Sequence, residues 1–399
     1  MKVLIVVSSL DLTQPFSATP AWWQLMKGLY EIGVEVVATP YQGPAIESLW
    51  WRAEPNPAKL YGDAFKIARD TLRALLPERP VQMDATSETV DEDSESLTEK
   101  ITRQTAQTLI APLWQRHLDT ILTDQPDIDA VIFLTIPLNH VVGVPTAIQQ
   151  KHDIPVLYYD GDVPASLPNM KGFASGFRIY QGADPSEYTA FISNSTGGAD
   201  YLRELGAKAV HTLWYAADPT LYAPLDLPQD YDAFFFGHGR EYRAEWIDAM
   251  LIEPSQQLPD MRFAVRGKNL GDTGAVEQLP YLSFSKLREY VCRSKLNLVI
   301  TRGAHASVYG SSSMRPFELG ALGATMVANP YEGIEEWYEP EKEIIVVSSG
   351  EEAQDRYRYL LAHDSERLAL GKAARERVLK QHTFQHRARE LQAIIEQYI

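Results

Sequence analysis

The sequence predicts an α/β protein built from two doubly wound, Rossmann-like domains. Short apolar segments alternate with segments of helical periodicity along most of the 399 residues. Strands this apolar are buried on both faces, which is typical of a parallel sheet covered by helices. A stretch rich in proline and aspartate at residues 215–230, YAADPTLYAPLDLPQD, separates one such series from a second. The chain also exceeds the length of one ordinary domain, which averages roughly 150 residues.

These patterns place an acceptor-side domain at residues 1–222, a ligand-binding domain at residues 223–382 and a terminal helix at residues 383–399, which can return to the first domain. In the first domain, strands are expected at residues 3–7, 34–39, 130–135, 155–159, 189–194 and 209–213, and helices at 21–31, 98–122, 146–151 and 198–205. In the second, strands are expected at residues 233–236, 262–266, 296–301, 325–328 and 344–347, and helices at 241–251, 284–293, 315–322, 352–361, 365–380 and 384–398.

The composition argues against several classes of partner. The net charge of −16 repels nucleic acid and anionic lipid, so we expect no nucleic-acid partner. The single cysteine, Cys292, allows neither an internal disulfide nor a multi-thiolate metal site, and it favours a reducing, cytoplasmic compartment. No apolar run approaches the length of a transmembrane segment. His382 and His386 imitate a zinc spacing, but Thr383 is a predicted N-cap that leaves His382 outside the helix, so we expect no metal.

The polar stretch at residues 301–323, TRGAHASVYGSSSMRPFELGALG, is the strongest functional signal. Ser313 is a good cap residue and Pro316 is tolerated in a first turn, so a helix is predicted to begin near Ser313. The helix N-terminus and Arg315 suit a diphosphate, while Glu318, about one turn later, suits the two hydroxyls of a ribose. The alternative is that Glu318 only complements the helix dipole and pairs with Arg315.

Three loops at one edge of the second sheet carry further candidates for binding phosphate. A two-glycine turn follows the strand at residues 233–236 and leads into two arginines, and the strand at 262–266 ends in RGKN. The alternative is that these arginines are ordinary surface residues. Because the loops converge in an otherwise acidic chain, they predict a phosphate site. The candidates from the turn, the strand end and the polar stretch are Gly237, Gly239, Arg240, Arg243, Arg266, Lys268, His305, Ser307, Ser312 and Ser313.

In the first domain, polar residues follow two predicted strands and would face the cleft. Asp160 and Asp162 come directly after the strand at residues 155–159, where either could orient a hydroxyl or act as a base. The alternative is that Asp-Gly-Asp only forms a turn, in which these residue types are common. His140 ends another strand and could contact an acceptor, or it could serve as a helix cap or a packing residue.

The second half of the chain resembles the group 1 glycosyltransferases, and more closely their CgeB-like branch. The resemblance rests on RPFELGALGA at residues 315–324, GIEEWYEPEKEIIVV at 333–347, the helix at 357–379 and HTFQHRA at 382–388. Residues 193–224 resemble the segment that ends the first domain in that family. The match covers about the last 210 residues, and the first 190 resemble the family only in architecture.

The resemblance implies a GT-B fold, a nucleoside-diphosphate-sugar donor held mainly by the second domain, no required metal or cofactor, and transfer with retention of the anomeric configuration. Glu318 matches the carboxylate that binds the donor ribose, and Arg243 matches a diphosphate-binding cation. The family pattern has two glutamates with seven residues between them, and Gly310 stands at the earlier position. Residues 8–11, SSLD, replace the usual glycine pair after the first strand.

We therefore predict a metal-independent glycosyltransferase of the hexosyltransferase type, whose acceptor is a glycan, lipid, protein or small molecule. The alternative, motivated by Gly310, is a catalytically silent GT-B scaffold that binds a nucleotide or glycan. A third hypothesis, a sugar epimerase with the GT-B fold, has no support in the sequence beyond the shared architecture.

Overall fold

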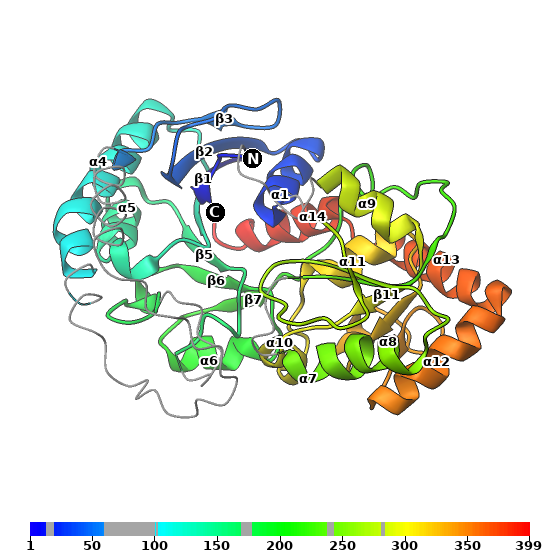
Figure 1. Cartoon of the computed structure of the whole chain (residues 1–399). Coiled ribbons are helices and arrows are strands. Elements are labelled where there is room, and N and C mark those ends of the chain that lie inside the picture. Colours follow the sequence, from blue (N-terminus) through cyan, green and yellow to red (C-terminus); the bar gives the residue numbers. More distant parts are fainter. Residues whose placement is uncertain (13–19, 60–99, 101–102, 169–177, 238–242, 281–283) are drawn as a thin grey trace.

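The computed structural model describes residues 1–12, 20–59, 100, 103–168, 178–237, 243–280 and 284–399. Two parallel sheets lie side by side, each covered by helices (Figure 1). The first has the strand order β3-β2-β1-β4-β5-β6-β7 and the second β10-β9-β8-β11-β12-β13. All strand pairs within the described residues are parallel, so the predicted pair of doubly wound sheets is confirmed.

The strands of the first sheet lie close to the predicted segments. They are β1 (Lys2–Ser9), β2 (Glu35–Gln42), β3 (Arg52–Ala53), β4 (Ala130–Leu134), β5 (Val156–Asp160), β6 (Ala190–Ser193) and β7 (Val210–Thr212). Its helices are α1 (Ala21–Glu31), α4 (Ala111–Asp124), α5 (Val144–His152) and α6 (Gly198–Glu204), with a π-helical turn at Ala106–Ile110 and 3₁₀ turns at Leu138–His140 and Pro185–Glu187. Much of the long helix expected from residue 98 is seen, but its first turn falls largely outside the described residues.

The second sheet contains β8 (Tyr231–Phe236), β9 (Phe263–Arg266), β10 (Glu277–Gln278), β11 (Ser294–Val299), β12 (Met326–Ala328) and β13 (Ile345–Val346). Its helices are α7 (Ala244–Ile247), α8 (Glu253–Gln257), α9 (Phe284–Cys292), α10 (Gly303–Ser307), α11 (Met314–Ala321), α12 (Gly350–Ala362) and α13 (Asp364–Gln381), and α14 (Phe384–Ile395) ends the chain. A π-helical turn at Asp248–Ile252 divides the single helix expected at residues 241–251, and a 3₁₀ turn lies at Ile334–Glu336. The short α10 lies in a stretch expected to be a loop.

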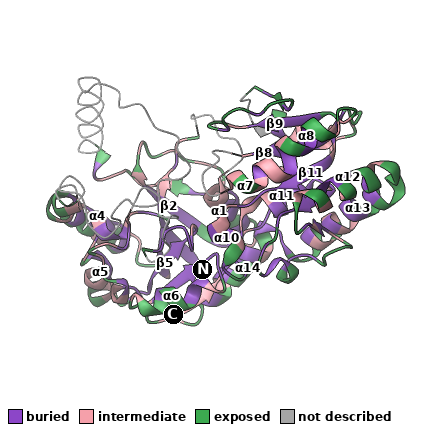
Figure 2. Ribbon diagram, turned by 60° about the horizontal axis from the view of Figure 1, so that its bottom comes forward, coloured by how far each residue is buried: buried purple, intermediate pink, exposed green. Residues whose placement is uncertain are grey.

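Burial on both faces of each sheet explains the apolar strands. Along β1, Val3 and Ile5 belong to one core cluster, whereas Leu4 and Val6 belong to another on the opposite face. Figure 2 shows the buried strands enclosed by helices whose outer faces are exposed. In the described part of the chain, no helix has the length and apolar character needed to cross a membrane.

The terminal helix α14 returns to the first domain and packs on α1, as the sequence analysis allowed (Figure 1). Thr383 caps it, and His386 completes a capping box, so the N-cap prediction is confirmed. A Cβ atom on Gly28 would lie 2.7 Å from the Phe384 carbonyl oxygen, so glycine permits this close approach. Leu391 is buried in the same cluster as the strand residue Ile5. The end of the chain is therefore part of the first domain's core.

Leu391→Ala tests this role of the terminal helix. We expect it to lower the free energy of unfolding of the first domain by about 2–5 kcal/mol, because it opens a cavity in a packed core. The matched control is Leu379→Ala on α13, where the leucine is 41% exposed and the expected change is within about 0.5 kcal/mol. Urea unfolding followed by tryptophan fluorescence measures both. Equal losses for the two variants would contradict the role of α14.

Candidate functional site

The loops at the carboxyl ends of the two sheets meet between the domains. The loop after β6 contacts the segment before α11, where the Gly197 amide donates to the Tyr309 carbonyl at 2.8 Å. The loop after β5 contacts the loop after β11, where Arg302 Nη2 lies 2.8 Å from Asp162 Oδ1. This is the edge at which parallel α/β sheets bind ligands. Most of the predicted site residues follow strands that end here.

Two arginines from different elements of the second domain lie together at this edge. Arg243, before α7, and Arg315, in α11, both donate to the Ile300 carbonyl, at 3.3 and 3.0 Å. A Cβ atom on Gly237 would lie 3.1 Å from a guanidinium nitrogen of each. A side chain at this position would crowd both guanidinium groups, so glycine permits the two arginines to lie close to the turn.

Burial and neighbouring positive charges lower the pKa of both arginines, an effect that a nearby anion would offset. The pKa of Arg243 is lowered to about 9, mainly by burial and further by the positive charges of Arg315 and Arg302. Burial is also the main cause that lowers the pKa of Arg315 to about 10. Arg315 lies over the rings of Phe235 and Phe236, with its guanidinium carbon 5.1 and 4.9 Å from their centroids. Both pKa values stay above neutrality, so two positive charges are held side by side.

A third arginine and a histidine follow β11. Arg302 reaches across to Asp162, and the buried His305 places Nε2 3.7 Å from the same carboxylate oxygen. Burial, followed by the charges of Arg302 and Arg243, lowers the pKa of His305 to about 3. His305 is therefore neutral at physiological pH and offers a hydrogen bond but no charge. Arg302 was not among the predicted site residues, although its position after an apolar strand is a signal that could have revealed it.

The remaining predicted phosphate ligands differ in position. Arg266 is buried at the end of β9, next to the glycine turn, whereas Lys268 is exposed. The Ser307 hydroxyl donates within its own helix, to the Ala304 carbonyl at 3.4 Å. Gly239 and Arg240 lie outside the described residues.

The helix α11 begins at Met314 with Ser313 as its N-cap residue, as predicted, but the serines before it have a second use. The Ser312 hydroxyl donates to the Asn194 carbonyl and accepts from the Tyr215 amide, both at 2.9 Å. The Ser195 and Ser311 hydroxyls are 2.5 Å apart. The side chain of Ser312 is thus occupied in joining the domains, and Ser313 is the serine closer to the helix start.

Glu318 is only 2% exposed, and the protein already supplies it with one partner. The Tyr222 hydroxyl, from the connection between the domains, donates to Glu318 Oε1 at 2.6 Å. Burial raises the pKa of Glu318 to about 7, against the opposing effects of the Tyr222 bond and the Arg315 charge. A ribose hydroxyl would have to share this carboxylate with Tyr222.

Gly310 occupies a tight joint between the domains. Its φ of 60° lies in the left-handed region that favours glycine, and a Cβ atom would lie 2.9 Å from Thr196 Oγ1. Its carbonyl accepts from the Thr196 amide at 3.2 Å and from Trp214 Nε1 at 3.1 Å. A glutamate at this position would be strained, because the backbone is left-handed and Thr196 crowds the place of a Cβ atom.

The three first-domain candidates have different surroundings. Asp160 is fully buried and accepts from the Ser166 and Tyr180 hydroxyls at 2.6 and 2.5 Å, so its role in this conformation is to hold the loop. Asp162 is partly exposed and faces the second domain through Arg302; burial is the main cause that raises its pKa. His140 Nδ1 pairs with the Tyr41 hydroxyl at 2.7 Å, and burial lowers the pKa of His140 to about 4.

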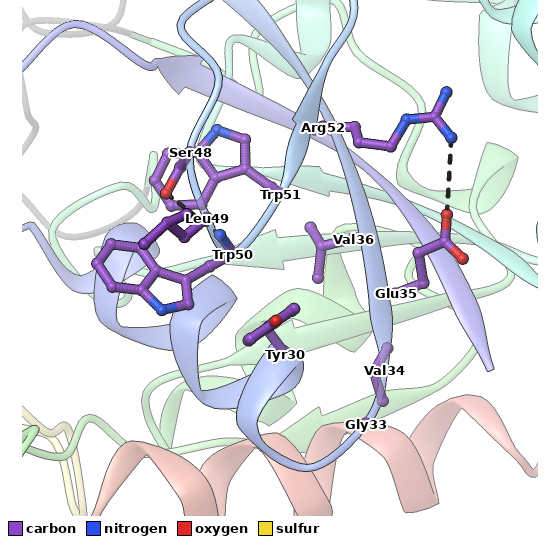
Figure 3. Close-up of a pocket in the computed structure, with 10 residues that line it drawn as sticks. All are labelled: Tyr30, Gly33, Val34, Glu35, Val36, Ser48, Leu49, Trp50, Trp51 and Arg52. Atoms are coloured by element: carbon purple, nitrogen blue, oxygen red, sulfur yellow. Dashed lines mark hydrogen bonds and ion pairs between the residues drawn. The ribbon is translucent and has the colours of Figure 1, made fainter.

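A separate pocket of about 330 Å³ lies at the amino end of β2, and neither Arg243 nor Arg315 lines it (Figure 3). Trp50, Trp51 and Tyr30 supply much of its lining, and Arg52 and Glu35 lie 3.9 Å apart at its side. This pocket lacks the convergent cations of the interdomain edge, so it is a poor candidate for a phosphate site.

Comparison with known proteins places these features in context. Residues 240–393, less than half of the chain, match a family model described as glycosyl transferase-like. A sucrose-phosphate synthase from Thermosynechococcus elongatus is 14% identical with a TM-score of 0.66, and the match covers 100% of this chain and 99% of that one. The Anabaena protein HepE in complex with UDP-glucose is 11% identical with a TM-score of 0.60, and both chains are covered in full.

An Escherichia coli trehalose-6-phosphate structure bound with UDP-2-fluoro glucose is 11% identical with a TM-score of 0.63, over 100% of this chain and 99% of that one. A search of curated proteins finds no match to the sequence. The structural likenesses, over the full length, show that the chain has the GT-B fold. The expected fold is therefore confirmed.

The buried carboxyl of Glu318 predicts a specific dependence of stability on pH. Its pKa rises from 4.5 to about 7 on folding, so the folded chain binds more protons between these values and loses stability as the pH rises through them. Glu318→Gln removes this ionisation. We expect the unfolding free energy of the variant, relative to the unmodified chain, to rise by on the order of 3 kcal/mol from pH 4.5 to 7.

Urea unfolding at several pH values between 4.5 and 7.5 measures this difference. Glu396→Gln, at an exposed position in the last turn of the chain, is the matched control, and its difference from the unmodified chain should be flat. A flat difference for Glu318→Gln as well would show that the carboxyl is solvated in the folded protein.

Proposed function

We propose that this chain is a glycosyltransferase that moves a sugar from a nucleoside-diphosphate-sugar donor to an acceptor. The observation that carries the proposal is the pair Arg243 and Arg315, which converge on one carbonyl beside Gly237 at the carboxyl edge of the second sheet. Two cations that share a neutral acceptor are poised to bind a multiply charged anion. The glycosyl transferase-like match begins just before this arginine pair and includes both members of it.

The chemistry assigned to this site is stabilisation of a leaving diphosphate. As the bond between the anomeric carbon and the phosphate oxygen breaks, negative charge develops on the diphosphate, and fixed guanidinium groups lower the energy of that state. Arg243 and Arg315 would supply this charge without a divalent cation. Retention of the anomeric configuration is the outcome that the family resemblance implies, and we adopt it, together with placement in the CgeB-like branch, as part of the proposal.

The first domain would present the acceptor. Asp162 is the candidate that faces the second domain, and its carboxylate would orient an acceptor hydroxyl. Asp160 would act indirectly by fixing the loop that carries Asp162. His140 would contact an acceptor only through Nε2, because Nδ1 bonds to Tyr41.

HepE, bound to UDP-glucose, makes a uridine nucleotide of a hexose the first donor to try. Glu318 would bind the donor ribose through the carboxylate oxygen that Tyr222 does not occupy. His305 and Ser313 would donate to phosphate oxygens near the start of α11. A thermal-shift comparison of UDP, GDP, ADP and dTDP identifies the base, because a bound nucleotide stabilises the folded state by mass action.

A second candidate function is a catalytically silent scaffold that binds a nucleotide or a glycan. Two observations favour it: Gly310 removes the first family carboxylate, and Tyr222 occupies part of the second. Hydrolysis or transfer in a panel of nucleotide sugars separates the two functions. Turnover by the purified chain excludes the scaffold, and nucleotide binding without turnover, in the presence of a panel of acceptors, favours it.

Arg315→Ala tests the diphosphate site. We expect the dissociation constant for UDP, or for the nucleotide that the thermal-shift comparison selects, to rise about 10- to 100-fold, because a charge-assisted hydrogen bond contributes about 1.5–3 kcal/mol. Isothermal titration calorimetry measures this constant. The matched control is Arg358→Ala on the exposed face of α12, which should leave it unchanged. Unchanged affinity in a folded Arg315→Ala variant would remove the basis of the proposed function.

A further inference from the structure

One ion pair joins the two domains at the candidate site. Arg302 Nη2 donates to Asp162 Oδ1 at 2.8 Å, with Asp162 after β5 in the first domain and Arg302 after β11 in the second. The two side chains are 36% and 33% exposed for Arg302 and Asp162, respectively. A pair with this exposure contributes only about 0–1 kcal/mol, so a stronger partner can replace it.

The loop that carries Asp162 is held in place independently of Arg302. The Asp162 amide donates to Asp160 Oδ1 at 3.0 Å, and the next amide, of Val163, donates to Asn194 Oδ1 at 3.0 Å. The Tyr215 hydroxyl donates to the Gly161 carbonyl at 2.5 Å. Asp162 would therefore keep its place if Arg302 moved away.

Arg302 belongs electrostatically to the same cationic group as Arg243 and Arg315. Burial is the largest cause of the lowered pKa of Arg243, and the charges of Arg315 and Arg302 lower it further. In the part of the chain that the structure describes, the contact with Asp162 is the one ion pair that these three arginines make with a carboxylate. Asp162 is thus the carboxylate in direct contact with this cationic group, while Glu318 influences Arg315 through its negative charge.

We propose that Asp162 is the internal counter-ion of the diphosphate site, and that a nucleoside diphosphate displaces it from Arg302. The released carboxylate is then free to accept a hydrogen bond from an acceptor hydroxyl. This inference rests on the proposed function and adds an order to it: the donor binds first and makes the acceptor position available. It also assigns Arg302 as a third binding residue for the diphosphate.

The proposal predicts a gain of affinity on removing a carboxylate. Asp162 competes with the diphosphate for Arg302 and repels its negative charge, so Asp162→Asn removes both effects. If Asp162 instead contacted the donor, or only joined the domains, the same substitution would weaken binding or leave it unchanged. The sign of the effect therefore distinguishes the counter-ion role from a structural one.

A double-mutant cycle with Asp162→Asn and Arg302→Ala tests the proposal. The probes are UDP and inorganic pyrophosphate, titrated by calorimetry into the full chain. We expect Asp162→Asn to tighten the binding of both probes about 3- to 10-fold and Arg302→Ala to weaken it about 10-fold. Once Arg302 is absent, Asp162→Asn should have a smaller effect, because the competition for Arg302 is gone and only the direct repulsion remains. Asp162→Ser serves the same purpose if the asparagine variant does not fold.

Asp200→Asn is the matched control, because Asp200 pairs with Arg203 on the exposed face of α6 and should not affect binding. Unchanged or weaker binding in Asp162→Asn would overturn the counter-ion role. The proposed function would survive that result as long as Arg315→Ala weakens binding. If the unmodified chain binds neither UDP nor pyrophosphate, nor any other nucleotide of the thermal-shift panel, both the counter-ion role and the proposed function fail.

Discussion

Two guanidinium groups held side by side on one backbone carbonyl are the constraint on which the site depends. Arg243 and Arg315 repel each other, yet α7 and α11 begin at positions that direct both toward Ile300. The guanidinium group of Arg315 lies over the rings of Phe235 and Phe236. A fold that keeps like charges this close stores electrostatic free energy, which the binding of an anion would release.

The joint between the domains sets what the rest of the site can contain. Gly310, Ser311 and Ser312 are used to fasten the segment before α11 to the end of the first sheet. A carboxylate cannot occupy position 310 without displacing Thr196, because the backbone there is left-handed and crowded. The packing between the domains therefore accounts for a glycine at position 310. The same joint brings Asp162 of the first domain into contact with Arg302 of the second.

The sequence was informative where a periodic pattern or a cap dictated local structure. The alternation of apolar strands and helices predicted both sheets, and Ser313 and Thr383 marked the starts of α11 and α14 correctly. It was less informative about side-chain partners, because these depend on contacts between residues far apart in the chain. Neither the Tyr222 bond to Glu318 nor the Arg302 bond to Asp162 has a local signature, since the partners are separated by 96 and 140 positions.

The sequence also could not distinguish between candidates whose side-chain partners lie far away in the chain. Asp160 and Asp162 are equivalent in a turn motif, but only the structure distinguishes a carboxylate enclosed by Ser166 and Tyr180 from one that faces the other domain. The serines before α11 are good cap residues by composition, and the domain joint uses one of them fully. The π-helical turn at Asp248–Ile252 is another feature that the apolar stripe of this helix did not predict.

A crystal structure of the chain with bound UDP is the most direct measurement of the central claim. The account predicts diphosphate oxygens at roughly 3 Å from guanidinium nitrogens of both Arg243 and Arg315. A diphosphate bound elsewhere, with both arginines still directed only at the Ile300 carbonyl, would contradict it.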